Sequence, residues 1–191
     1  MGSVHFFLGF EVSRLAAGLH LSQTKYALDL LRKTNMLDST PCSTPAVPGK
    51  KLSLHEGDIF SDPSLYRSTI GALQYLTLSR PDLAYIVNKL SQFLVAPILI
   101  HWQACKHVLR YIRGTIDHGL FFSPAKHFVL EGYVDADWAS SVDDRRSTSG
   151  YCVYLGGNLL TWSSKKQQVV ARSSTEAEYR DLHMQILKWC G

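Results

Sequence analysis

Cysteine is sparse in this chain, and its spacing argues against two classes of small protein. The cysteines at positions 42, 105, 152 and 190 lie far apart and form no C-x-x-C pair. A zinc knuckle needs closely spaced pairs, and a disulfide framework needs a regular cysteine pattern. We therefore expect a protein of a reducing compartment, without a zinc knuckle or a disulfide scaffold.

Long apolar runs are also absent. The longest, FLVAPILI at residues 93–100, contains Pro97, and its eight residues fall far short of the roughly 20 that a membrane-spanning helix needs. The N-terminus MGSVHFFLGFEV lacks the basic region and cleavage site of a signal peptide, and Phe6 stands where a myristoylation motif needs serine or threonine. We expect no membrane segment and no signal peptide, hence an intracellular protein of undetermined compartment.

The chain has no strong excess of charge of either sign. Lysine and arginine total 20 against 16 acidic residues, which gives a net charge of +4 and a pI near 8.9. This balance is compatible with a polyanionic partner but lacks the lysine-rich arm of a dedicated nucleic-acid binder. With 46% hydrophobic and 19% charged residues, the chain has the composition of a globular protein with a sizeable core.

The first 115 residues predict a hairpin followed by helices. Two strands flank a turn at residues 16–18, and Ser22 is placed to cap a helix that reaches about Met36. Residues 38–63 hold four of the seven prolines and predict a long surface loop. Three further helices are predicted at residues 64–79, 81–95 and 101–114.

The pattern then changes to short segments rich in aromatic and β-branched residues. An antiparallel meander is predicted from HGLFFS, FVLEGYVDADWA, GYCVYLGG, NLLTWSS and QQVVARSS, with turns at residues 156–158 and 165–166. A helix is predicted in SSTEAEYRDLHMQILKW, where Ser173 with Glu176 and Thr175 with Glu178 both match a capping box. The predicted fold class is therefore α+β.

Carboxylates in the meander and in the last helix predict a metal site. Asp135 and Asp137 are two apart in a strand and point to one face. Glu178 heads a helical stripe continued by Leu182, Ile186 and Trp189, so it is predicted to point at the sheet near Asp135. Gathered carboxylates need a neutralising cation, and hard oxygen ligands favour Mg²⁺ or Mn²⁺. The alternative is a capping glutamate beside a solvated strand face.

Basic side chains on the helix at residues 101–114 predict a second kind of contact. Lys106, Arg110 and Arg113 form a stripe suited to a nucleic-acid backbone, with an ordinary solvated helix face as the alternative. His107 lies on a different face of this helix from His101 and Cys105, which disfavours a zinc site. The acidic and basic residues at 143–146 predict a surface turn with compensating charges.

Four motifs carry a family resemblance. YVDADWA, DRRSTSGY, LTWSSKKQQVVARSSTEAEY and STIGALQYLTLSRPDLAY resemble the Pol polyproteins of copia-type LTR retrotransposons, especially those of plants. The resemblance covers nearly the whole chain. It implies that residues 1–115 correspond to the thumb- and connection-like end of the reverse transcriptase region. Residues 116–126 would be a linker, and residues 127–191 the first three strands and first helix of a ribonuclease H domain.

The same resemblance implies roles for two of the carboxylates. Asp135, in YVDADW, matches the first metal-binding aspartate of ribonuclease H, and Glu178, in STEAEY, matches the glutamate of its first helix. Both are therefore expected to be catalytic, metal-binding residues, whereas Asp137 matches no family role. The family reaction is Mg²⁺-dependent hydrolysis of the RNA strand of an RNA–DNA hybrid.

The resemblance also implies that parts of both enzymes lie outside this sequence. The Y-x-D-D turn of the polymerase would precede residue 1, and the later acidic residues of ribonuclease H would follow residue 191. We expect a catalytically incomplete fragment that binds Mg²⁺ weakly and has an open sheet edge at the Asp135 strand. Two alternatives are a non-catalytic nucleic-acid-binding remnant and a ribonuclease H completed by a partner chain, such as the rest of a Pol polyprotein.

Overall fold

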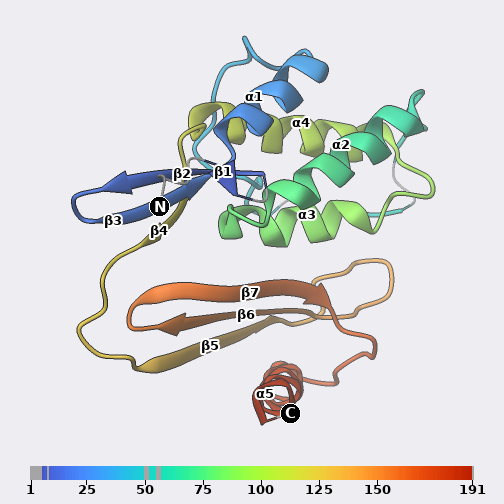
Figure 1. The fold of residues 1–191 in the computed structure, drawn as a ribbon. Helices are drawn as coiled ribbons and strands as arrows, with labels where there is room; N and C mark the ends of the chain where they lie inside the picture. Colours follow the sequence, from blue (N-terminus) through green and yellow to red (C-terminus); the bar gives the residue numbers. More distant parts are fainter. Residues whose placement is uncertain (1–5, 8, 50–51, 55–56, 191) are drawn as a thin grey trace.

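The N-terminal strands form an antiparallel sheet that includes a distant segment of the chain (Figure 1). The computed structural model describes residues 6–7, 9–49, 52–54 and 57–190, except for the side chains of residues 184–190. The strands, in sheet order, are β1 (Phe6–Phe7), β2 (Phe10–Leu15), β3 (Gly18–Ser22) and β4 (Gly119–Phe122). The predicted hairpin is confirmed, since Leu15 pairs with Gly18.

Strand β4 corrects the predicted meander. It lies inside residues 116–126, the expected linker, and pairs antiparallel with β3 rather than with the C-terminal strands. Gly119 allows this close pairing, because a Cβ atom there would overlap the carbonyl oxygen of Leu21. Residue composition predicted this strand correctly, but it carries no information about which strand is the partner.

Helices occupy the region between the hairpin and β4, as predicted. They are α1 (Thr24–Lys33), α2 (Pro63–Leu76), the 3₁₀ turn η1 (Pro81–Leu83), α3 (Ala84–Ser91) and α4 (Leu99–Gly114). Helix α1 ends before the predicted Met36 and is followed by Asn35 in a left-handed conformation, with φ 55°. Its N-cap is Gln23 rather than Ser22. Helix α2 is capped by Asp62, whose carboxylate accepts a hydrogen bond from the Leu65 N–H.

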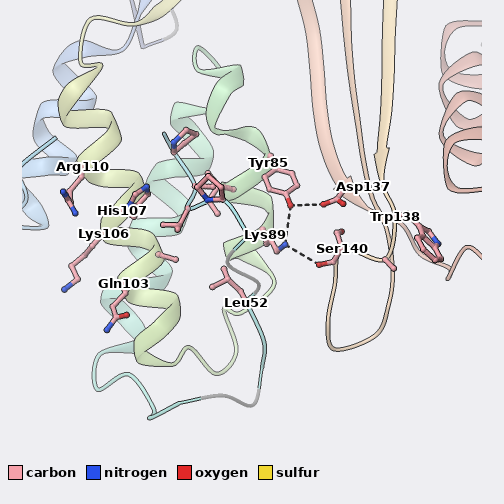
Figure 2. A pocket seen from close by; sticks show the side chains of 18 of the residues that line it. Leu52, Tyr85, Lys89, Gln103, Lys106, His107, Arg110, Asp137, Trp138 and Ser140 are labelled. Atoms are coloured by element: carbon pink, nitrogen blue, oxygen red, sulfur yellow. Dashed lines mark hydrogen bonds between the residues drawn. The ribbon is translucent and has the colours of Figure 1, made fainter. Parts of the chain in front are cut away.

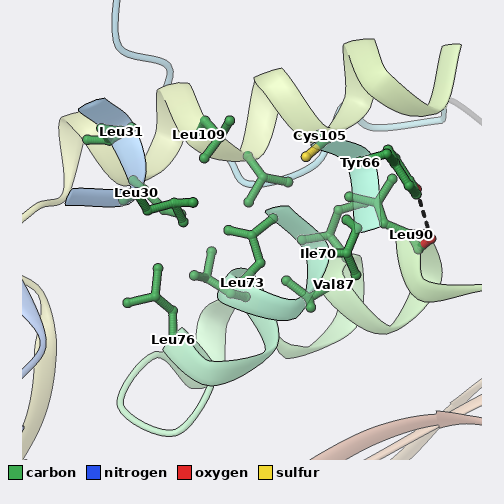
Figure 3. Close-up of a cluster of buried hydrophobic side chains, with 14 of the residues drawn as sticks. Leu30, Leu31, Tyr66, Ile70, Leu73, Leu76, Val87, Leu90, Cys105 and Leu109 are labelled. Atoms are coloured by element: carbon green, nitrogen blue, oxygen red, sulfur yellow. Dashed lines mark hydrogen bonds between the residues drawn. The ribbon is translucent and has the colours of Figure 1, made fainter. Parts of the chain in front are cut away.

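These helices share one apolar core (Figure 3). Tyr66 is fully buried and donates a hydrogen bond from its hydroxyl to the Leu90 carbonyl oxygen, 2.8 Å away. His101 is also fully buried and stacks on Phe93, with ring centroids 3.8 Å apart. Its Nδ1 accepts from the Ile98 N–H and its Nε2 donates to the Ser53 carbonyl oxygen, so the imidazole is neutral.

The C-terminal part contains a three-stranded antiparallel sheet. Its strands, in sheet order, are β5 (Leu130–Asp137), β6 (Thr148–Leu155) and β7 (Asn158–Lys166). The predicted turn at 156–158 is confirmed, because Gly156 and Gly157 join β6 to β7 with φ values of 56° and 80°. The predicted turn at Lys165–Lys166 is wrong, since both lysines pair with β6, and QQVVARSS forms no strand.

Helix α5 (Ser174–Cys190) begins where the sequence predicts. The Ser173 hydroxyl accepts a hydrogen bond from the Glu176 N–H, and the Glu176 carboxylate accepts one from the Arg172 N–H. These two hydrogen bonds confirm the first predicted capping box. The Glu176 carboxylate bonds to the N–H of Arg172, one residue before the N–H of Ser173 that a standard capping box uses. The second one, Thr175 with Glu178, is wrong because Thr175 already lies inside the helix.

The C-terminal sheet lies between α5 on one face and the helical region on the other (Figure 1). Helix α3 packs against β7, where Trp162 donates its indole N–H to the Thr77 carbonyl oxygen, 3.2 Å away. The side chain of Asn158 forms two hydrogen bonds with the backbone of Ser123, between β4 and β5. The predicted α+β class is confirmed.

Candidate functional site

Asp135 and Asp137 share one face of β5, as their spacing predicts. They pair across the ladder with Gly150 and Thr148 of β6. This face is turned to α3, because the Tyr85 hydroxyl donates a hydrogen bond to Asp137 Oδ2 at 3.1 Å (Figure 2). The intervening Ala136 is buried on the other face, towards α5. Asp137, which matches no family role, thus has a structural one: it contacts the helical region.

Helix α5 does not present Glu178 to the sheet. Ala177 is fully buried beside Ala136, and Asp181, one turn later, is only 4% exposed, whereas Glu178 is exposed to solvent and Leu182 is 44% exposed. The face of α5 that packs on the sheet is therefore offset by one residue from the predicted stripe, because it contains Ala177 and not Glu178. The small Ala177 allows close approach of helix and sheet, which hydrophobic spacing alone does not reveal. The predicted positions of Ile186 and Trp189 fall outside the described side chains.

Asp135 and Glu178 nevertheless line one pocket of about 510 Å³, together with Thr175 and three apolar or aromatic residues. Strand β5 is at the edge of its sheet, so Asp135 borders this pocket although the pleat places it on the face opposite α5. Both side chains are exposed at the pocket.

The oxygen donors of this pocket suit a hard cation. Two carboxylates and the Thr175 hydroxyl are the ligand type that Mg²⁺ prefers, with water and phosphate oxygens in the remaining positions. Among the residues that the structure describes, no group of three or more histidine, cysteine, aspartate or glutamate side chains could hold a metal ion.

Two residues of the predicted basic stripe, Arg110 and Arg113, bind backbone carbonyl oxygens of another segment of the chain. Arg110 Nε donates to the Thr40 carbonyl oxygen at 2.6 Å, and Arg113 Nε donates to the Leu37 carbonyl oxygen at 2.7 Å. These bonds hold the start of the proline-rich segment against α4. Lys106 and Arg110 also line a cleft of about 770 Å³, whereas Arg113 does not. The structure thus separates Arg113 from the other two residues of the stripe.

His101, Cys105 and His107 do not converge on a common point. His101 bonds to Ser53, and His107 Nε2 donates to the Thr44 carbonyl oxygen at 2.9 Å. Burial raises the pKa of the Cys105 thiol to about 12, so this cysteine is a protonated core residue. The sequence did not indicate that Cys42 lies beside His107, with 3.6 Å between Sγ and Nε2.

The charged turn at residues 143–146 connects the two parts of the molecule. Asp143 accepts hydrogen bonds from the Ser53 hydroxyl at 2.9 Å and from the Leu54 N–H. Asp144 pairs with Lys166 and Arg146, so the predicted charge compensation is present. The contact of Asp143 was missed because its partners lie about 90 positions earlier in the chain.

Comparison with known proteins places these features in a family. The chain is 54% identical to the retrovirus-related Pol polyprotein from transposon RE2 of Arabidopsis thaliana and 38% identical to that from transposon TNT 1-94 of Nicotiana tabacum, in each case over 94% of its length. An uncharacterised mitochondrial protein of Arabidopsis thaliana is 47% identical over 95% of the chain and 75% of its own length. The chain belongs to the family of retrovirus-related Pol polyproteins of plant transposons.

The match is to a small part of these polyproteins. The chain spans 12% of the RE2 polyprotein and 14% of the TNT 1-94 polyprotein. No family model and no solved structure matches the chain. Within the described part of the chain, no helix combines the length and the apolar character that a membrane crossing requires.

Proposed function

We propose that this chain is the segment of a copia-type Pol protein that connects the end of the reverse transcriptase region to the start of the ribonuclease H region. In this proposal Asp135 and Glu178 are two of the carboxylates that hold Mg²⁺ for hydrolysis of the RNA strand of an RNA–DNA hybrid. The observation that carries the proposal is their shared pocket, which joins a strand and a helix more than 40 residues apart in the sequence.

The chemistry of the pocket supports this role. Bound Mg²⁺ would activate a water molecule and stabilise the leaving oxygen of the scissile phosphate. Asp135 and Glu178 would hold the ion, with water and substrate phosphate oxygens as its other ligands. Two carboxylates bind Mg²⁺ weakly by themselves, so we expect the isolated chain not to cleave a hybrid.

A second candidate function follows from the edge of the C-terminal sheet. Within the described residues β5 pairs only with β6, so its other edge presents backbone donors and acceptors to solvent. Another chain, or another part of a longer Pol protein, would add a strand there and bring further carboxylates to the pocket. In that case the same two residues belong to an active nuclease.

Metal binding and cleavage test the two candidates separately. Mn²⁺ binding, followed by electron paramagnetic resonance, should weaken at least fivefold in Asp135→Asn and in Glu178→Gln. The matched control is Asp117→Asn, which removes an exposed carboxylate outside the pocket. Equal binding by all four proteins would refute the metal site. The isolated chain should not cleave a labelled RNA–DNA hybrid. If it does, and if Asp135→Asn abolishes the cleavage, the statement that the site is catalytically incomplete is wrong.

A further inference from the structure

A pocket of about 460 Å³ lies on the face of the C-terminal sheet that is turned to α3. Gly150, in the central strand β6, pairs with Asp135 of β5 on one side and with Ser164 of β7 on the other. Apart from its chain neighbours, a Cβ atom at Gly150 would meet only two described atoms within 4 Å, the carbonyl oxygens of Ser163 and Asp135. The glycine therefore leaves a hollow in the middle of this sheet face.

Aromatic rings line the pocket from both parts of the molecule. Trp162 of β7 and Tyr133 of β5 stand on the same face of the sheet, because both pair with Cys152 of β6. Tyr85 adds a ring from α3. The Trp162 indole and the Tyr85 hydroxyl each donate one hydrogen bond across the boundary, which fixes these two rings. The ring of Tyr133 packs edge-on against that of Tyr154, with centroids 5.9 Å apart.

The charge of this pocket is negative. Among the described residues that line it, Asp135 and Asp137 are the only charged side chains. Lys89 Nζ lies 3.4 Å from the Tyr85 hydroxyl and offsets part of the charge of Asp137, but it lines the cleft of about 770 Å³ and not this pocket. Within the described part of the chain, the Asp135 carboxylate has no hydrogen bond or ion pair. The lining therefore favours a cationic ligand.

Rings and carboxylates together indicate the kind of cation. Both aspartates are exposed, so solvent screens their attraction for a ligand. A primary ammonium group is strongly hydrated, and a screened attraction does not offset the loss of its water. A quaternary ammonium group is weakly hydrated, and the negative faces of aromatic rings attract it directly. The volume of the pocket is that of a small-molecule site.

We propose that this pocket binds a small quaternary ammonium compound, with the cationic head against Tyr85, Tyr133 and Trp162 and near Asp135. Asp135 borders this pocket and the proposed metal site. The proposal nevertheless goes beyond that site, because it requires neither Mg²⁺ nor Glu178. Equal Mn²⁺ binding by the carboxylate variants would leave it unaffected. A bound ligand would contact both parts of the molecule at their boundary.

The test compares choline with 3,3-dimethylbutan-1-ol, which has the same shape but a carbon atom in place of the positive nitrogen. Titrations of the full chain in EDTA follow the ¹⁵N-labelled indole N–H resonance of Trp162, assigned from its loss in Trp162→Phe. Choline should shift this resonance and bind roughly fivefold more tightly than the alcohol, which is the size of one cation–π contact. The resonance of Trp102, which stacks on Phe60 outside the pocket, should not shift.

Matched variants separate the ring from the charge. Tyr133→Leu should weaken choline binding roughly fivefold, whereas Tyr133→Phe keeps the aromatic face and should bind within twofold of the wild type. Asp135→Asn should weaken binding about twofold to fivefold, and Asp117→Asn, outside the pocket, should not. Thermal melting checks that each variant is folded. Equal affinity of the wild type for choline and the alcohol would overturn the proposal, and so would Tyr133→Leu binding choline as tightly as Tyr133→Phe.

Discussion

The Tyr85 hydroxyl lies 3.1 Å from Asp137 Oδ2, across the boundary between the helical region and the C-terminal sheet. Burial, reinforced by the negative charge of Asp137, raises the pKa of Tyr85 to about 12. Tyr85 is therefore neutral at physiological pH and serves as a hydrogen-bond donor between the two parts.

Removal of this donor should loosen the boundary. Tyr85→Phe should lower the free energy of unfolding by about 1 kcal/mol, the typical contribution of one hydrogen bond. Urea denaturation measures the change, and amide hydrogen exchange should accelerate in β5. The control is Tyr179→Phe, at a side chain 68% exposed, which should change stability little. If the two variants lose the same stability, the bond contributes nothing.

The raised pKa also predicts a dependence on alkaline pH. The folded pKa lies above that of an unfolded tyrosine, near 10, so the stability that this group contributes is complete below pH 10 and is lost as pH rises towards 12. The difference in unfolding free energy between the wild type and Tyr85→Phe should shrink over this range. A constant difference up to pH 12 would contradict the assignment.

His101 predicts a dependence on acidic pH. Burial lowers its pKa, although the hydrogen bond to Ser53 opposes this. Below about pH 6.5 the unfolded chain binds a proton that the folded chain still excludes, so stability falls as pH decreases from 6.5. Denaturation of the wild type between pH 7.5 and 5 should show this decline, and His101→Gln should be less stable at neutral pH with a shallower decline. An identical slope would exclude His101 as its source.

Gly119 tests the pairing of β4 with β3. Gly119→Ala places a Cβ against the Leu21 carbonyl oxygen and should destabilise the protein by about 2 kcal/mol or more. Gly71→Ala is the matched control: a Cβ at this position in α2 meets no atom within 4 Å, so it should be neutral or stabilising by up to about 1 kcal/mol. Thermal melting of the two variants distinguishes them. A tolerated alanine at 119 would contradict the observed strand pairing.

Ala177 and Glu178 test which side of α5 faces the sheet. Ala177→Asp places a charge in a fully buried position and should destabilise the protein by about 3 kcal/mol, whereas Glu178→Gln should change stability by less than about 0.5 kcal/mol. Chemical denaturation provides both values. The reverse order would restore the stripe headed by Glu178 and place that carboxylate against the sheet.

Local sequence signals predicted the elements better than their arrangement. The Gly156–Gly157 turn and the Ser173 cap depend on residues within a few positions of each other, and both were found as predicted. The sequence did not predict the partner strand of β4, the buried face of α5 or the contacts of Asp143. Each depends on atoms that are distant in the sequence, for which periodicity and composition give no signal.

By itself, the sequence determined the α+β class, the common face of Asp135 and Asp137, and the membership in a Pol family, because these follow from strand periodicity and extended motifs. Only the tertiary structure decided that Asp137 bonds to Tyr85 and that Asp135 and Glu178 border one pocket from an edge strand and a helix. It also joined Lys89 to Lys106 in one cleft. The physical reason is that the packing of α3 and α5 on opposite faces of one sheet brings these side chains together, and that packing depends on the volumes of buried residues such as Ala136 and Ala177.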